Sequence, residues 1–422
     1  MNALIKQATI IDSESPYNGK TMDLLIERGV ITQIRKSIQP EKGMKVISSE
    51  NLHVSAGWFD MQVNFCDPGF EHKETLENGL KAAAKGGFTG VALMSGTNPP
   101  LQNKGQIDYV INKSKLNPVE VFPVGTLSAL QEGRDLSEMY DMKLSGAVAF
   151  GDYKKAVKDA GLILRALQYA KNIGSFIITH CDDKTISHGG LMNEGAVSTR
   201  LGLKGMPALA EEIMLQRNLQ VLEYAGGKLH IPTISTKGSV EILRRAKAKK
   251  LNVSCGVAAY NLLLDDSELE GFDTNFKLNP PLRTKEDIEA LKKGLADGTI
   301  DVIVSDHIPQ DVESKDLEFD HADDGMIGLE SCFGVLNKAM EKKVALELTV
   351  NVLTSNPRNI LGLPEVKVKE GERANLTLFN PEKSNVFTKS QIVSSNKNSG
   401  FLGKALKGEV IGIINKNTFI GQ

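Results

Sequence analysis

Polar side chains recur where short apolar runs end in the central part of this 422-residue sequence, and they are the first candidates for chemistry. They are Gln62, Asn64, Asp152, His180, Thr233, Asp306 and His307. Carboxylate and imidazole groups are the ligands of hydrolytic zinc sites, so Asp152, His180 and Asp306 are candidate metal ligands. The same side chains also suit polar residues satisfied by hydrogen bonds at the mouth of a barrel. Spacing alone leaves both interpretations open, because the three candidates form no short metal-binding motif.

The elements that must position these residues alternate regularly between strands and helices. Short β-rich stretches begin near residues 57, 88, 119, 146, 175, 228, 252 and 301. Amphipathic stretches such as KETLENGLKAAAKGG and SVEILRRAKAKK lie between them, with apolar residues three and four apart. Eight alternations predict the α/β class and a closed (β/α)8 TIM-type barrel over residues 56–364. Loops after the strands form the active site of such a barrel, so we expect the polar candidates at one mouth.

The two ends of the chain have a different pattern. Residues 1–55 and 365–422 contain short alternating runs separated by turn residues. We expect these ends to form one small composite β domain, a β-sandwich. Residues 308–324 are polar and are predicted to be a mobile loop after the eighth barrel strand.

Composition and charge exclude several classes of partner. Fifty basic and fifty-two acidic residues give a net charge of -2, which provides no field for nucleic acid or an anionic membrane surface. The N-terminal residues lack the apolar core of a signal peptide, so we expect a cytoplasmic protein. The four cysteines are scattered without a C-x-x-C pair, which predicts reduced thiols and no structural zinc site.

Several long stretches resemble the dihydroorotase family of the amidohydrolase superfamily, whose members are cyclic amidohydrolases. They are DPGFEHKETLENGLKAAAKGGFT, GLMNEGAVSTRLGLKGMPALAEE, HIPTISTKGSVEILRRAK, NFKLNPPLRTKEDIEALKKGLADGTIDVIVSDHIP and GMIGLES. The resemblance runs from the first barrel strand to about residue 365. It implies the barrel, metal-dependent hydrolysis of a ring amide and a place in pyrimidine biosynthesis.

The metal positions implied by this resemblance are depleted. Gln62 and Asn64 replace the two histidines of the family's His-x-His pair, and Thr233 replaces a third histidine ligand after strand six. Asp152 matches the first aspartate of the family stretch Phe-Ser-Asp-Asp-Gly, although the local alignment allows a shift of one position. His180 and Asp306 match retained ligands, and the resemblance also gives Asp306 the general-base role, here vestigial.

The implied substrate contacts are depleted as well. Cys66 replaces the arginine that receives the substrate carboxylate, and a bidentate charged donor is thereby lost. Gly96 replaces an asparagine, and Gln310 replaces the last histidine of Asp-His-Ala-Pro-His. Asn279 is a retained contact, while Asp323 and Asp324 replace apolar residues of the mobile loop.

These losses predict a non-catalytic member of the family. Each missing ligand lowers metal affinity by about 10- to 100-fold, so we expect no cofactor, and zinc only in a retained site. We expect hydrolase activity to be lost or strongly reduced, and the folded barrel to keep a structural or regulatory role. The resemblance implies aspartate transcarbamoylase as a candidate partner, and a homodimer is common among such barrels. The alternative is an active dihydroorotase or related cyclic amidase with one metal held by Asp152, His180 and Asp306.

Overall fold

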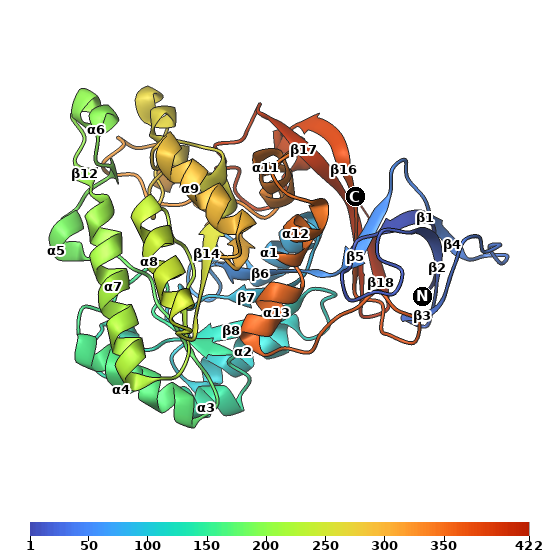
Figure 1. Cartoon of the computed structure of the whole chain (residues 1–422), viewed down its shortest axis with the longest axis horizontal. Coiled ribbons are helices and arrows are strands. Elements are labelled where there is room, and N and C mark those ends of the chain that lie inside the picture. Colours follow the sequence, from blue (N-terminus) through green and yellow to red (C-terminus); the bar gives the residue numbers. More distant parts are fainter. Residues whose placement is uncertain (422) are drawn as a thin grey trace.

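A barrel of parallel strands forms the centre of the molecule in a computed structural model, which describes residues 1–421 (Figure 1). The strands are β6 (Trp58–Val63), β7 (Phe88–Leu93), β8 (Glu120–Gly125), β9 (Ala149–Phe150), β10 (Ile177–Ile178), β13 (Leu229–Ile231), β14 (Val253–Ala258) and β15 (Val302–Val304). They pair in this order, and a bridge between Val63 and His307 joins the last strand to the first. The prediction of a (β/α)8 barrel is confirmed.

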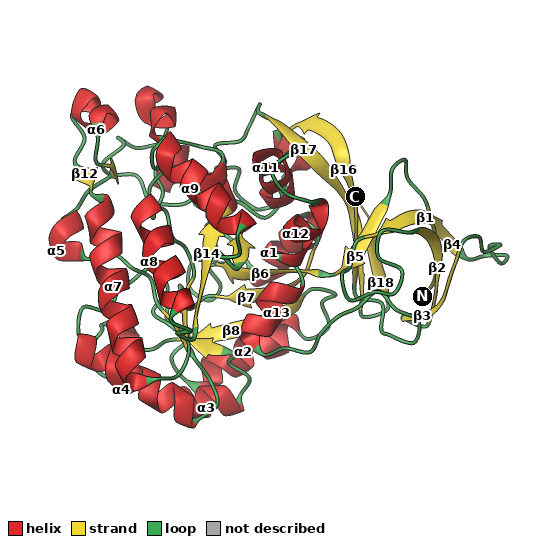
Figure 2. Cartoon of the chain, in the orientation of Figure 1, coloured by secondary structure: helices red, strands yellow, loops and turns green. Residues whose placement is uncertain are grey.

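Helices cover the outside of these strands (Figure 2). The longer ones are α1 (Leu76–Lys85), α2 (Lys104–Ser114), α4 (Ala160–Asn172), α7 (Ala208–Ala225), α8 (Lys237–Ala248), α9 (Lys285–Ala296) and α11 (Cys332–Ala339). Shorter ones are α3 (Met139–Leu144), α5 (Lys184–Ser187), α6 (Ala196–Leu201), α10 (Val312–Lys315), α12 (Leu346–Asn351) and α13 (Ser355–Leu361), and β11 (Met192–Asn193) pairs with β12 (Gly205–Met206). Side-chain caps define several starts: Thr284 and Asp287 form a capping box at α9.

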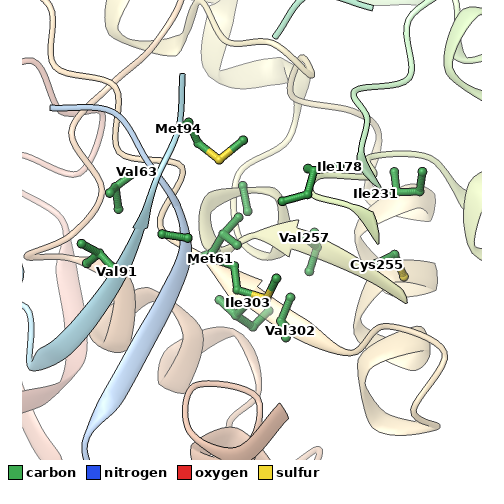
Figure 3. Packing of buried hydrophobic residues seen from close by; sticks show 14 of the residues in the cluster. Met61, Val63, Val91, Met94, Ile178, Ile231, Cys255, Val257, Val302 and Ile303 are labelled. Carbon is green, nitrogen blue, oxygen red and sulfur yellow. The ribbon is translucent and has the colours of Figure 1, made fainter. Parts of the chain in front are cut away.

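Apolar side chains fill the barrel and the layer between strands and helices. Met61, Val257 and Ile303 come from three strands and lie close together in Figure 3, within one buried cluster. Helix α1 packs so tightly on this core that a Cβ added to Gly79 would lie 2.2 Å from the Phe65 ring. This packing fixes the strand ends that carry the candidate site.

A second sheet combines both ends of the chain beside the barrel (Figure 1). Its strands are β1 (Asn2–Ile10), β2 (Thr21–Glu27), β3 (Val30–Arg35), β4 (Lys45–Ile47), β5 (His53–Ala56), β16 (Leu376–Val386), β17 (Ala405–Asn415) and β18 (Thr418–Gly421). The N-terminal and C-terminal parts meet where β5 pairs antiparallel with β16, with Ser55 opposite Thr377. A separate cluster of buried apolar residues supports this sheet.

Two further features concern the thiols and the helices. Cys66, Cys181, Cys255 and Cys332 are all free and buried. Within residues 1–421, no helix combines the length and apolarity that a membrane crossing requires.

A candidate site at the mouth of the barrel

The Asp306 carboxylate, just after β15, is the centre of the candidate site. Its side chain is 1% exposed and accepts hydrogen bonds from three side chains. Gln62 Nε2 donates to Oδ1 at 2.6 Å, and Tyr260 Oη donates to Oδ2 at 2.6 Å. Lys154 Nζ donates to Oδ2 at 2.8 Å. Protein donors therefore engage both carboxylate oxygens.

Lys154 supplies the positive charge opposite Asp306. It lies between β9 and α4, its side chain is 15% exposed, and its ammonium also donates to the Asn279 carbonyl oxygen at 2.6 Å. A buried carboxylate needs a paired cation or several donors, because desolvation of an isolated charge is very costly. This pair satisfies that requirement without a metal ion.

Asp152, just after β9, accepts hydrogen bonds from the loop that follows β8. Its Oδ1 accepts from the backbone N–H groups of Leu127 and Ser128, each at 2.9 Å, and its Oδ2 accepts from the Ser128 hydroxyl. Burial raises the pKa of Asp152, and these hydrogen bonds oppose the shift. The carboxylate therefore holds the loop after β8.

The next residue, Tyr153, faces the mouth instead. A Cβ added to Gly96 would lie 2.6 Å from the Tyr153 ring and 3.0 Å from Asn64 Nδ2. Asn64 Nδ2 donates to the Gly96 carbonyl oxygen at 3.3 Å, and Asn64 Oδ1 accepts from the Cys66 backbone at 3.0 Å. The Tyr153 ring therefore packs beside Gly96 and Asn64.

His180 and Thr233 lie buried near the ends of β10 and β13. Burial, followed by the charge of Lys154, lowers the pKa of His180 to about 4, so the imidazole is neutral at pH 7. Within residues 1–421, the two ring nitrogens of His180 find no hydrogen-bond partner, and neither does the Thr233 hydroxyl. His230, in contrast, pairs with Ser254 at 2.8 Å, which agrees with a structural role.

The positions implied for substrate contacts are mostly engaged within the protein. Burial raises the pKa of Cys66 to about 12, so this position carries an uncharged thiol. Gln310 accepts from Lys73 Nζ at 2.6 Å and donates to the Asp324 carbonyl oxygen at 2.7 Å. Asn279 contributes its backbone carbonyl to Lys154.

The loop at residues 308–324, which we expect to be mobile from its polarity, makes contacts with the rest of the chain at several points. Lys73 pairs with Asp323 at 2.8 Å. Lys277 Nζ donates to the carbonyl oxygens of Asp320 and Ala322, and Lys315 Nζ donates to that of Asp323. Asp323 is thus neutralised by a neighbouring lysine rather than left facing the mouth unpaired.

These residues do not fit a zinc ion. Across residues 1–421, no three His, Cys, Asp or Glu side chains form a group that could hold a metal ion. Structural and catalytic zinc sites use at least three such ligands, and here Gln62, Asn64 and Thr233 stand at three of the implied positions. In the part of the chain that the structure describes, Asp152, His180 and Asp306 do not form such a group.

Sequence reasoning missed Lys154 and Tyr260, which both contact Asp306. Lysine is usually solvated, so a lysine in the sequence gives no reason to expect a buried contact. Charge balance was the available signal, because a buried aspartate whose metal ligands are missing requires another cation.

Comparisons with known proteins agree with the fold and identify the family. The model of the family described as "Dihydro-orotase-like" matches residues 53–239. The chain is 41% identical over 410 residues to the dihydroorotase of Geobacter metallireducens, covering 97% of this chain and 96% of that protein. It is 39% identical to the dihydroorotase of Acetivibrio thermocellus, covering 99% of each.

Solved structures extend the likeness of fold. The L-hydantoinase of Arthrobacter aurescens matches with a TM-score of 0.85 at 22% identity, covering 100% of this chain and 96% of that one. A D-hydantoinase matches with a TM-score of 0.83 at 23% identity, covering 100% and 97%. Since full-length sequence identity to the dihydroorotases is far above these values, the chain belongs to the dihydroorotase family.

Proposed function

We propose that this protein is a non-catalytic member of the dihydroorotase family that serves pyrimidine biosynthesis through its folded surface. The observation that carries the proposal is the state of Asp306, whose two carboxylate oxygens accept from Gln62, Lys154 and Tyr260. A carboxylate held by three protein donors is poorly placed to bind a metal ion or to accept a proton from a nucleophile.

Hydrolysis of a ring amide at neutral pH needs a strong nucleophile. A metal ion supplies one by lowering the pKa of bound water from 15.7 to about 7. The residues at the mouth do not fit such an ion, and His180 is the only histidine among the three retained ligand candidates. Hydrolysis of a ring amide at this site would therefore lack its source of hydroxide.

Recognition of an acidic substrate is weakened independently. Cys66 is buried with a pKa of about 12 and offers no positive charge to a carboxylate. Gln310 is already engaged with Lys73 and the Asp324 backbone. Each hydrogen bond lost from a substrate costs about 1 to 3 kcal/mol when its polar group stays buried.

The retained barrel supports a structural or regulatory role in the cytoplasm. By family resemblance, aspartate transcarbamoylase is the proposed partner, with self-association into a homodimer as the other interaction to test. Neither interaction needs a metal ion at the mouth. A complex should therefore survive treatment with a chelator.

Ring opening of dihydroorotate by the purified protein with added zinc tests the proposal. The matched control is Asp306→Asn, purified in the same way, which measures hydrolysis by contaminating host enzyme. We expect equal, background rates for both proteins. A wild-type rate more than about tenfold above the control would refute the proposal. Sedimentation with aspartate transcarbamoylase, with and without chelator, tests the interaction separately.

Active dihydroorotase is the second candidate function. Identity of 41% over 97% of the chain to a protein named dihydroorotase favours it. This candidate requires the mouth to rearrange so that Asp306 leaves its three donors. Zinc that stays bound in stoichiometric amount through buffer exchange would support it.

A further inference from the structure

We propose that Lys154 is a built-in cation of the barrel mouth, which takes over the charge role of a metal ion and excludes metal from Asp306. The inference deepens the proposed function and rests on its claim that the mouth works without metal. Missing ligands are one barrier to metal binding in this proposal. An occupied charge site adds a second, independent barrier.

The contacts of Lys154 place its ammonium inside the mouth. Nζ lies 2.8 Å from Asp306 Oδ2 and 2.6 Å from the Asn279 carbonyl oxygen. Charge-assisted hydrogen bonds to buried carboxylates are the strong ones, because little water is present to screen them. The same carboxylate cannot bind an ammonium and a divalent cation through one oxygen without strong repulsion between the two cations.

The replaced positions support one coordinated arrangement around Asp306. Gln62 stands where the family has a histidine ligand, and Tyr260 lies just after β14. Both side chains donate to the Asp306 carboxylate, at 2.6 Å each. Substitutions that only removed a metal would leave this carboxylate unpaired, whereas these supply it with donors.

Burial leaves the side chains around Asp306 with one another, rather than water, as hydrogen-bond partners. Gln62 and Tyr260 are each 2% exposed and Asp306 is 1% exposed, so solvent contributes little to their hydrogen bonding. Lys154 is the one member that reaches toward the surface, with 15% of its side chain exposed. An incoming metal ion would have to displace the ammonium and break the Gln62 and Tyr260 hydrogen bonds.

The decisive experiment restores the metal ligands with and without Lys154. The starting variant carries Gln62→His and Asn64→His, which returns the two imidazoles of the family's His-x-His pair. A second variant adds Lys154→Gly, which removes the ammonium from the mouth. The matched control instead adds Lys155→Gly, which removes the next, exposed lysine.

Bound zinc is measured by elemental analysis after equilibrium dialysis, and circular dichroism checks the fold. We expect the variant with Lys154→Gly to bind at least about tenfold more zinc than the starting variant and the Lys155→Gly control. If the glycine variant does not fold, Lys154→Met in the same background replaces it. Cobalt absorption provides a second readout of coordination.

Equal zinc in the starting variant and the Lys154→Gly variant, whether both are filled or both are empty, overturns the assignment. An increase of the same size in the Lys155→Gly control overturns it as well. Ring opening of dihydroorotate by the metal-free wild type would overturn the proposed function alone. Stoichiometric zinc in the wild type would overturn both.

Discussion

Replacing Lys154 with methionine should destabilise the fold even though no catalytic step depends on it. Methionine keeps the length of the side chain but leaves the Asp306 carboxylate with only the neutral donors Gln62 and Tyr260. Removal of one partner from a buried ion pair costs about 3 to 5 kcal/mol, because the remaining charge stays desolvated. Unfolding entropy scales with chain length, so for 422 residues this cost lowers Tm by about 3 to 6 °C.

A double-mutant cycle separates the ion pair from simple loss of packing. Asp306→Asn alone places an amide against the ammonium and should also lower Tm. The double variant Lys154→Met/Asp306→Asn carries no unpaired charge, so its cost should be smaller than the sum of the single costs by about 0.5 to 3 kcal/mol. Differential scanning calorimetry at one scan rate measures all four proteins. Additive costs would refute the argument that these two charges stabilise each other.

Three further predictions concern residues around the site. Burial lowers the pKa of His307 to about 3, so below pH 6.5 the unfolded chain binds more protons than the folded one. This difference lowers the free energy of unfolding by about 3 kcal/mol between pH 6.5 and 4. Thermal unfolding of His307→Asn should therefore show a correspondingly weaker pH dependence. Asp152→Ala should lower Tm by about 2 to 6 °C without changing zinc content, because two backbone N–H groups lose their acceptor. Gly79→Ala should lower the free energy of unfolding in urea by about 1 to 3 kcal/mol, since the added Cβ would overlap Phe65. Gly105→Ala in α2 is the control: its added Cβ would lie 3.5 Å from the nearest atom, so the change should not destabilise the fold.

The barrel could be predicted from the sequence because each of its strands is a short apolar run next to an amphipathic helix. Strand β6 illustrates the rule, since all six residues from Trp58 to Val63 are buried. Helix α1 shows the complementary pattern, with apolar residues on the face that meets the strands and Thr75 at its start. Local periodicity is enough to identify such elements.

The candidate site could be predicted only in part. The loss of histidines at Gln62, Asn64 and Thr233 was visible from the family pattern. The role of Lys154 was not, because its contact with Asp306 spans 152 residues and depends on how the loop after β9 folds. The hydrogen bonds of Asp152 to the loop after β8 were not visible either, because they also depend on how two loops fold together.

The loop at residues 308–324 illustrates a second limit of sequence reasoning. Its polar composition favours mobility, but Lys73 and Lys277 reach it from distant parts of the chain. Composition describes a segment by itself, whereas anchoring depends on donors brought close by the rest of the fold. Long-range partners of this kind carry no local pattern.

The pairing of β5 with β16 also determines the order in which parts of the sheet can form during synthesis on the ribosome. Ser55 is made early, while its partner Thr377 follows more than three hundred residues later. At about 5 to 20 residues per second, the first strands wait roughly 15 to 60 s for this neighbour. During that interval β5 is an open edge, where another nascent chain could add a strand. Its length of four residues keeps that edge short, so the delay exposes little backbone to wrong pairing.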